Sequence, residues 1–399
     1  MAHRSENFMK PRKIVEKVYW LGAIDWNRRL FDALIPLPDG TSYNAYLVQG
    51  SEKTALLDAV DPSTTDTLLA QLRDIPQLDY VISHHAEQDH SGAIPAVLEK
   101  YPEAQVLTSS KAKGLLVDLL DIAEGKITPV GDGETLSLGD KTLKFIYTPW
   151  VHWPETMVTY LEEDHILFSC DFFGSHLATT ELYGEEERVY EPAKRYYAEI
   201  MMPFHGAIKG NLEKLKAYEI NIIAPSHGPL YRRPSFITEA YWDWVAADPK
   251  NIVVLPYASM HGSTEKMVDH LIGSLVEQGV KVEPFNLAVT DLGKLAMALV
   301  DAATVVFGTP TVMVHPHPLV IYAAYLANAL RPKVRFASMV GSFGWGTKAV
   351  ETLTGMVPNL KIEIISPVIC KGFPREADFA ALDELARTIA TKHQEGNFV

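Results

Sequence analysis

The chain has very little cysteine: Cys170 and Cys370 are the only two in 399 residues, and no C-x-x-C pair occurs. A zinc or iron site built from four cysteines is therefore excluded on this chain. Nothing supports a disulfide between residues so far apart in the sequence, and a reducing compartment explains the composition more simply. We therefore expect a cytoplasmic protein.

Long hydrophobic runs and a basic surface are also missing. No window reaches the roughly 18 apolar residues that a membrane helix needs. The N-terminal stretch MAHRSENFMKPRK lacks the apolar core of a signal peptide. The formal net charge of −14 argues against binding to nucleic acid, which requires a basic surface. We expect neither a membrane nor a nucleic acid as a partner.

The length allows two or three domains, and the pattern of elements changes near residue 250. Over residues 1–250, short β-rich runs alternate with turn residues and a few helices, which predicts a layered α+β sandwich. The predicted strands include TSYNAYLVQG, TALLDAV, LDYVISHH and AQVLTSS, and two hairpins are predicted around Gly139-Asp140 and Glu163-Asp164. Over residues 251–399, five apolar strands are each followed by a helical or loop-plus-helix segment. This alternation is the signature of a doubly wound parallel sheet. The five strands are IVVLPYA, VEPFNLA, ATVVFGT, VRFASMV and LKIEIIS.

Metal-capable side chains are concentrated in SHHAEQDHSG, directly after the apolar run LDYVI. Four of them form an H-x-E-x-D-H cluster: His85, Glu87, Asp89 and His90. Alternate residues that leave a strand end can face one cavity, so this spacing can serve two metal ions. Three more candidates each follow a predicted strand: His152, Asp171 and His227. Seven ligands are too many for one four-coordinate zinc, so the pattern favours a binuclear centre.

A single histidine or aspartate after a strand is usually a solvated turn residue or a hydrogen-bonded core residue. We therefore assign no metal role to five other histidines: His84, His165, His205, His270 and His317. The clustered residues differ, because so many charged or imidazole groups at one strand end would be costly without a cation.

The pattern of ligands resembles that of the metallo-β-lactamase fold, in which hydrolases usually carry H-x-H-x-D-H and bind zinc. Here Glu87 stands in place of the second histidine, and a carboxylate at this position favours iron over zinc. This variant is characteristic of the flavodiiron proteins (A-type flavoproteins). The strings HWPETMVTY, ILFSCD and PSHGP are also similar to that family.

The resemblance implies an N-terminal metallo-β-lactamase-like αββα sandwich over 1–250 and a C-terminal flavodoxin-like α/β domain over 251–399. It also divides the seven ligands between two irons, with Asp171 as the bridge. The first iron would be held by His85, Glu87 and His152, and the second by Asp89, His90 and His227.

The second domain carries a candidate flavin site on three loops. ASMHGSTEKM follows the first strand and offers hydroxyls and backbone N–H groups to a phosphate, although such a loop can also be only a capped helix start. GTPTVMV and GSFGWG follow two further strands, and ligands bind at this carboxyl edge of the sheet. The loops resemble those that bind FMN in flavodoxins. The candidate FMN-binding residues are Ser259, Met260, His261, Gly262, Ser263, Thr264, Pro310, Thr311, Val312, Met313, Ser342, Phe343, Gly344, Trp345 and Gly346.

Two positions depart from the family pattern. Asp32-Ala33 follows GAIDWNRRLF where many members carry His-Gly, and Met313-Val314 stands where asparagines are common. The first segment can approach the metal pocket, so the preference for O2 or NO stays open. The second leaves the hydrogen bonding and the potential of the flavin open.

The resemblance implies an oxidoreductase that reduces O2 to water, NO to N2O, or both, at a non-haem diiron centre fed by FMN. The sequence has neither a rubredoxin module nor a flavin reductase module, so the electron donor would be separate: rubredoxin or a reduced deazaflavin. The string SMHGST resembles the deazaflavin-oxidising members. The family's head-to-tail homodimer, or a tetramer of such dimers, would bring the FMN of one subunit to the irons of the other.

Two alternative functions remain at this stage. A binuclear hydrolase of the lactamase or glyoxalase II type would use the metals to activate water, but Glu87 and the flavin loops argue against it. A non-catalytic electron carrier would use only the flavodoxin-like domain, and would leave the seven ligands without a purpose.

Overall fold

A computed structural model of the chain describes residues 10–398; the segment MAHRSENFM, in which we expect no signal peptide, lies outside the described residues. The chain forms two compact units. Among the described residues, one contains 10–197 together with Phe204–Asp243, and the other contains Ala198–Pro203 and 244–398. Among the described helices, none combines the length and the apolar character that crossing a bilayer requires.

The first unit contains a seven-stranded sheet, which mixes antiparallel and parallel pairs. In sheet order its strands are β1 (Arg12–Val15), β2 (Val18–Asp25), β5 (Thr41–Gln49), β6 (Thr54–Leu57), β7 (Tyr80–Ser83), β8 (Gln105–Ser109) and β9 (Ile127–Val130). The strands β5 to β8 fall in runs that the sequence predicts as strands. The first two strands, β1 and β2, were not predicted.

A five-stranded sheet completes the first unit. In sheet order its strands are β10 (Thr135–Ser137), β11 (Thr142–Tyr147), β12 (Met157–Leu161), β13 (Ile166–Cys170) and β14 (Ile222–Pro225). The antiparallel pairs β10–β11 and β12–β13 confirm the two hairpins predicted around Gly139-Asp140 and Glu163-Asp164. The last pair, β13–β14, is parallel, so both strands end at the same edge of the sheet.

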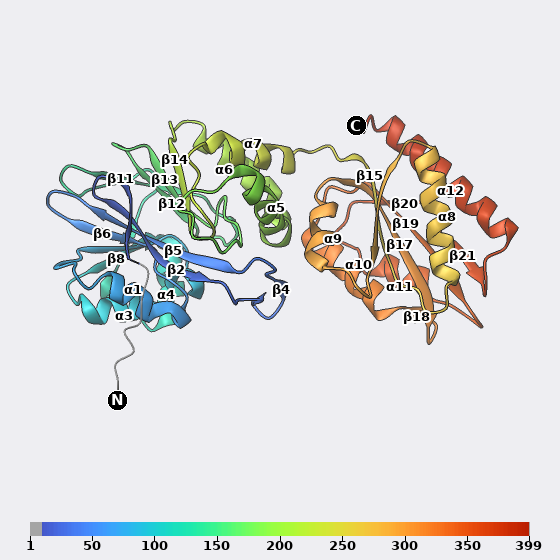
Figure 1. Ribbon diagram of the computed structural model, residues 1–399, viewed down its shortest axis with the longest axis horizontal. Coiled ribbons are helices and arrows are strands. Elements are labelled where there is room, and N and C mark those ends of the chain that lie inside the picture. Colours follow the sequence, from blue (N-terminus) through green and yellow to red (C-terminus); the bar gives the residue numbers. More distant parts are fainter. Residues whose placement is uncertain (1–9, 399) are drawn as a thin grey trace. The chain divides into compact units, whose positions relative to one another are not determined.

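The two sheets pack face to face, and helices cover their outer faces. Buried side chains from both sheets, such as Tyr46 and Phe168, form the core between them. On one side α1 (Thr65–Gln71), α3 (Ile94–Lys100) and α4 (Ser110–Leu120) bury Leu68, Ile94 and Leu116 against the larger sheet. The helices α5 (Glu186–Tyr196), α6 (His205–Leu215) and α7 (Pro234–Trp244) lie beside the smaller sheet (Figure 1). This arrangement is the expected αββα sandwich.

The second unit has a parallel central sheet in the order β16-β15-β17-β19-β20, the flavodoxin-like order in which the second strand lies outside the first. The strands are β15 (Lys250–Tyr257), β16 (Lys281–Asn286), β17 (Ala302–Val312), β19 (Phe336–Phe343) and β20 (Glu363–Ile364). The helices α8 (Ser263–Glu277) and α12 (Glu376–Glu395) pack on one face. The helices α9 (Leu292–Leu299), α10 (Pro318–Leu330) and α11 (Ala349–Gly355) pack on the other (Figure 1).

The fifth predicted strand, LKIEIIS, is mostly not a strand. Only Glu363–Ile364 pairs with β19, and pairing resumes with β21 (Val368–Lys371) along the same neighbour. The interruption, residues 365–367, contains Pro367, which has no N–H to donate and restricts the residue before it, so a continuous ladder cannot form there.

Candidate functional site

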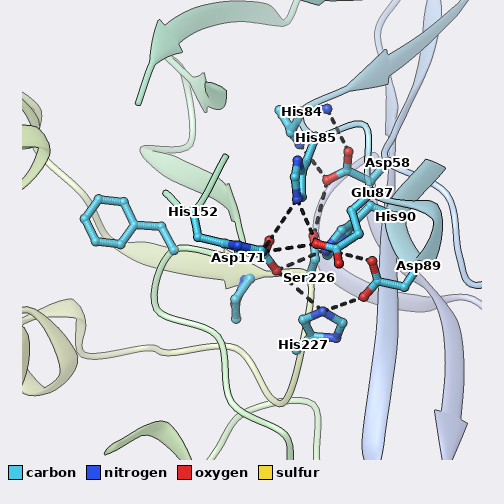
Figure 2. A network of polar contacts seen from close by, with 12 residues as sticks. Asp58, His84, His85, Glu87, Asp89, His90, His152, Asp171, Ser226 and His227 are labelled. Atoms are coloured by element: carbon cyan, nitrogen blue, oxygen red, sulfur yellow. Dashed lines mark hydrogen bonds and ion pairs between the residues drawn. The ribbon is translucent and has the colours of Figure 1, made fainter. Parts of the chain in front are cut away.

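The seven predicted metal ligands all lie where strands of the first unit end. The chain leaves β7 with His85 and Glu87 and then turns into the short helix α2 (Gln88–Ser91), which carries Asp89 and His90. The other three follow the smaller sheet: His152 in the loop from β11 to β12, Asp171 directly after β13, and His227 after β14. The structure therefore brings all seven side chains together (Figure 2).

The first group consists of His85, Glu87, His152 and one oxygen of Asp171. Oε2 of Glu87 lies 3.0 Å from Nε2 of His85 and 3.1 Å from Nε2 of His152. Both of these nitrogens lie 3.6 Å from Oδ2 of Asp171. The side chains of Glu87 and His152 are 16% and 17% exposed, so the pocket opens on their side.

The second group consists of Asp89, His90 and His227, with the other oxygen of Asp171 beside it. Nε2 of His90 lies 3.4 Å from Oδ1 of Asp89 and 3.0 Å from Oδ1 of Asp171. Nε2 of His227 lies 3.1 Å from Oδ2 of Asp89 and 3.5 Å from Oδ1 of Asp171. This group is buried.

Asp171 divides its carboxylate between the two groups, since Oδ2 faces the first and Oδ1 faces the second. Neighbouring ligands of one metal ion are about 3.0–3.5 Å apart when metal–ligand distances are about 2.0–2.2 Å. The nitrogen–oxygen distances given above for the two groups run from 3.0 to 3.6 Å, which is close to this spacing. The arrangement therefore suits two metal ions that share one carboxylate.

Unsatisfied polar atoms support the same conclusion. Both carboxylate oxygens of Asp89 and Oδ2 of Asp171 are buried and accept no hydrogen bond from any residue between 10 and 398. Buried carboxylate oxygens are costly when they are left without partners. Because imidazole nitrogens face these oxygens at ligand spacing, metal ions are the partners that fit.

The carboxylates of the cluster raise the pKa values of two of its histidines, which shows that the site favours positive charge. Burial alone would lower the pKa of His85, but its hydrogen bonds with Glu155 and Glu87 raise it to about 9. Burial likewise opposes protonation of His90, yet Asp171 and Asp89 hold its pKa well above the usual range. Without metal, protons on His85 and His90 would offset part of the negative charge, and metal ions would take the place of those protons.

Two carboxylic acids of the cluster, Asp171 and Glu87, have lowered pKa values. Burial would raise the pKa of Asp171, but His90 and the other histidines hold it well below its ordinary value. Burial would also raise the pKa of Glu87, which His152 and His85 instead lower. Both groups are therefore ionised and available as ligands near neutral pH.

Two residues for which the sequence predicts no role contact these ligands. Oε1 of Glu155, which is buried, lies 2.7 Å from Nδ1 of His85, and this contact lowers the pKa of Glu155 despite its burial. The hydroxyl of Tyr196 in α5 donates a hydrogen bond of 2.6 Å to Oδ1 of Asp171. The only sequence signal for Glu155 is an acidic residue three positions after His152, and nothing in the sequence marks Tyr196.

His84 lies behind the cluster and has protein partners on both ring nitrogens. Nδ1 lies 2.7 Å from Oδ2 of Asp58, and Nε2 lies 2.7 Å from the hydroxyl of Thr159. Asp58 also accepts the backbone N–H of His84 at 2.8 Å. The structure therefore uses His84 and Asp58 to anchor the start of the ligand-bearing loop (Figure 2).

Asp32, which departs from the family pattern, lies close enough to the cluster for the charges of Glu87 and Asp89 to affect its pKa. Asp32 and Ala33 form the tip between β3 (Leu30–Phe31) and β4 (Ile35–Pro36), and both have positive φ, 48° and 53°. Loss of hydration, followed by the negative charges of Glu87 and Asp89, raises the pKa of Asp32. The side chain itself is exposed.

The three predicted flavin loops share one edge of the second unit, because they follow the neighbouring parallel strands β15, β17 and β19. The predicted segments are only partly loops. Ser263 and Thr264 begin α8, residues 310–312 end β17, and residues 342–343 end β19, so that the loops proper are 258–262, the turn at 313–314 and 344–346. The structure thus brings the fifteen candidate residues to the carboxyl ends of three adjacent strands, on either side of the point where strand order reverses.

The first loop suits a phosphate. The hydroxyl of Thr264 is buried at the start of α8 and has no hydrogen-bond partner in the described part of the chain. Gly262 has φ of +84°, and a side chain there would meet no described heavy atom within 4 Å, so the backbone can be approached closely. Trp345 and Met313 are 83% and 82% exposed on the other two loops, where large apolar groups can cover a flat ring.

The sequence is similar to known oxidoreductases over nearly its whole length. Residues 41–228 match the family described as "ODP family beta lactamase". The nitric oxide reductase of Moorella thermoacetica is 36% identical over 396 residues, which cover 96% of this chain and 99% of that protein. The coenzyme F420H(2) oxidase of Methanothermobacter marburgensis is 32% identical, with 96% and 98% covered. These relatives favour an oxidoreductase over the hydrolase alternative.

The fold is similar to solved structures of the same kind. Rubredoxin oxygen:oxidoreductase from Desulfovibrio gigas superposes with a TM-score of 0.93 at 30% identity, covering 98% of this chain and 100% of that one. The flavodiiron protein of Giardia intestinalis superposes with a TM-score of 0.89 at 26% identity, covering 98% of each. This chain belongs to the flavodiiron family, the type A flavoproteins, and is an oxidoreductase.

Proposed function

We propose that the chain reduces O2 to water, NO to N2O, or both, at a pair of iron ions that receive electrons through FMN. The observation that carries the proposal is the seven-residue cluster, which divides into two groups meeting at the two oxygens of Asp171. The carboxylate of Glu87 in the first group makes the cluster more anionic than a histidine-rich hydrolase site, which favours iron.

His85, Glu87 and His152 would hold one iron, Asp89, His90 and His227 the other, and Asp171 would bridge them. When bound, these irons and FMN supply the passage of electrons from an external donor to O2, which takes four, or to two NO molecules, which take two. The donor of electrons and the substrate gas are both external to the chain.

The residues around the cluster bind and orient. Asp171 would keep the two ions adjacent, because each of its oxygens faces a different group, and Tyr196 holds that carboxylate through its hydrogen bond. The ring of Trp153 packs edge-on against His85 at 4.9 Å and shields that ligand from water. The partly exposed side of Glu87 and His152 is where a small gas molecule would enter.

We propose FMN as the flavin, with its phosphate at Ser259, Ser263 and Thr264 and its ring between the loops at Met313 and Trp345. The buried hydroxyl of Thr264 and the open space at Gly262 support the phosphate position. We propose residues 1–250 as the iron-binding domain and residues 251–399 as the FMN-binding domain.

The relatives' names indicate two classes of donor. One relative is called a rubredoxin-oxygen oxidoreductase and another a coenzyme F420H(2) oxidase, so we propose rubredoxin or a reduced deazaflavin. A head-to-tail homodimer, or a tetramer built from it, would place the FMN of one subunit against the irons of the other.

Metal and flavin analysis, followed by stopped-flow kinetics, tests the proposal. We expect about two irons and one FMN per chain. The fully reduced protein, mixed anaerobically with O2 or with NO, should be reoxidised rapidly by at least one of them. Bound zinc, no flavin and hydrolysis of a thioester or lactam would contradict the proposal. The ratio of the two reoxidation rates gives the preferred gas.

A further inference from the structure

One histidine of each proposed metal position, His85 in the first and His227 in the second, has a different kind of acceptor at Nδ1. His85 in the first group directs Nδ1 at the carboxylate of Glu155, at 2.7 Å. His227 in the second group directs Nδ1 at the backbone carbonyl of Ser42, also at 2.7 Å. The distances are equal, but one acceptor carries a full negative charge and the other is a neutral dipole.

Glu155 is held in place independently of His85. Its Oε1 also accepts the backbone N–H of Ala86 at 3.2 Å, and its own carbonyl accepts the hydroxyl of Ser109 at 2.6 Å. The side chain is fully buried, and its Oε2 meets no hydrogen-bond donor among the described residues. The carboxylate therefore has a fixed position and a charge that is poorly screened.

A fixed carboxylate that accepts a hydrogen bond from Nδ1 of a metal-binding histidine has two effects. As an acceptor for Nδ1–H, it leaves Nε2 as the nitrogen that can bind metal. Its negative charge also increases the basicity of the imidazole and favours the more highly charged ion at that position. A backbone carbonyl has the first effect but only a weak form of the second.

We propose that Glu155 is a positioning residue that makes the two metal positions unequal. The ion held by His85, Glu87 and His152 is retained more tightly, and has a lower reduction potential, than it would without the charge of Glu155. The ion held by Asp89, His90 and His227 does not depend on Glu155. This inference rests on the proposed diiron site.

Glu155→Gln tests the role of the charge. Glutamine has the same length and keeps an oxygen that can accept from His85 and Ala86, while its new NH2 group replaces an oxygen that has no partner. Release of iron from the reduced protein to a chromogenic chelator, followed anaerobically, should show one iron leaving about 10–100-fold faster than in the wild type. The other iron should leave at the wild-type rate. A redox titration should show one of the two iron couples at a higher potential.

Thr108→Val is the matched control. It also removes one buried polar contact near β7, because the hydroxyl of Thr108 donates to the carbonyl of Ser83 at 2.7 Å, but it leaves the charge of Glu155 intact. Both irons of this variant should leave at the wild-type rate. If Glu155→Gln does not fold, Glu155→Asp serves instead. Its shorter side chain moves the negative charge away from Nδ1 of His85 and weakens its effect, so one iron should again leave faster, by a smaller factor than in Glu155→Gln.

Each outcome separates the two proposals. A wild-type protein without two irons contradicts the proposed function itself. A two-iron wild type whose Glu155 variants lose both irons at equally increased rates, or at unchanged rates with unchanged potentials, contradicts the inference about Glu155 and leaves the diiron site intact.

Discussion

Asp171 is the residue on which the metal site depends most. Its two oxygens face different groups of ligands, and Tyr196 donates a hydrogen bond to one of them. It directly follows β13, where Cys170 has a positive φ of 52° that turns the chain out of the strand. The position of a single carboxylate thus determines whether the seven ligands act as one site or as two.

Replacement of Asp171 by asparagine should therefore weaken both metal positions. We expect a loss of affinity greater than the roughly 10–100-fold that removing a partner behind a ligand costs. Metal content after dialysis against a graded chelator measures this effect. Asp74→Asn, on the exposed surface, is the control and should retain the wild-type metal content. A variant at Asp171 that keeps both irons would show that this carboxylate is not shared.

A second prediction at this scale concerns His393, which is buried in α12. Nδ1 lies 2.8 Å from Oδ1 of Asn251 and Nε2 lies 2.7 Å from the hydroxyl of Thr304, so the neutral ring is satisfied. Burial lowers its pKa from 6.5 to about 4. The folded state therefore disfavours the proton that the unfolded state accepts, and the stabilisation present above pH 6.5 is lost as pH falls towards 4.

The size of this loss is at most about 3 kcal/mol, since each pKa unit corresponds to about 1.4 kcal/mol. Urea unfolding between pH 7 and 4, for the wild type and for His393→Gln, should show the advantage of the wild type shrinking over this range. A constant difference between the two proteins would mean that His393 does not titrate as stated.

At the scale of elements, the functional residues lie almost entirely where strands end. The ligands follow β7, β13 and β14 or lie between β11 and β12, and the flavin loops follow β15, β17 and β19. Strand pairing aligns these ends, so residues far apart in the chain meet at one edge. One such end is strained: the turn between β17 and β18 (His315–Pro316) contains only Met313 and Val314.

Both residues of this turn have positive φ, 46° and 68°, a conformation that suits asparagine or glycine and disfavours a β-branched side chain. Val314→Asn should therefore raise the free energy of unfolding by about 1 kcal/mol. Urea unfolding of the flavin-free protein measures it. Val276→Asn, on the exposed face of α8, is the control without such strain and should give no gain. Equal effects of the two variants would remove strain as the explanation.

At the scale of the whole molecule, a head-to-tail dimer would pair the FMN of one chain with the irons of the other. Two inactive variants should then complement each other. Asp171→Asn removes the metal site, and Ser259→Asp places a negative charge at the phosphate loop while keeping an acceptor for the N–H of Glu265. Each variant alone should be inactive.

Unfolding and refolding the two variants as an equal mixture should restore about a quarter of the wild-type O2 or NO consumption, because half of the dimers are mixed and each has one intact pair. Refolded wild type gives the reference activity. If each chain's FMN serves its own irons, the mixture stays inactive.

Residue types and spacing along the chain predicted a layered α+β sandwich followed by a doubly wound sheet, and they marked seven ligand candidates and three candidate flavin loops. The names of the two folds came from the family resemblance. These features depend on local patterns: apolar runs that end in ligand residues, and glycine- or hydroxyl-rich loops after strands. Glu87 could be recognised as unusual because it takes the place of the second histidine in the six-residue motif H-x-H-x-D-H.

Residue spacing alone did not divide the ligands into two groups. The family resemblance implied that division, and in the structure the two oxygens of Asp171 face different groups because β13 and β14 are paired. The tertiary structure also supplied Glu155 and Tyr196, which contact ligands from other elements, and Asp58, which contacts His84 beside them. Their roles could not be predicted because a hydrogen bond between side chains requires positions within about 3 Å. Packing of sheets and helices, rather than any local run of sequence, sets those positions.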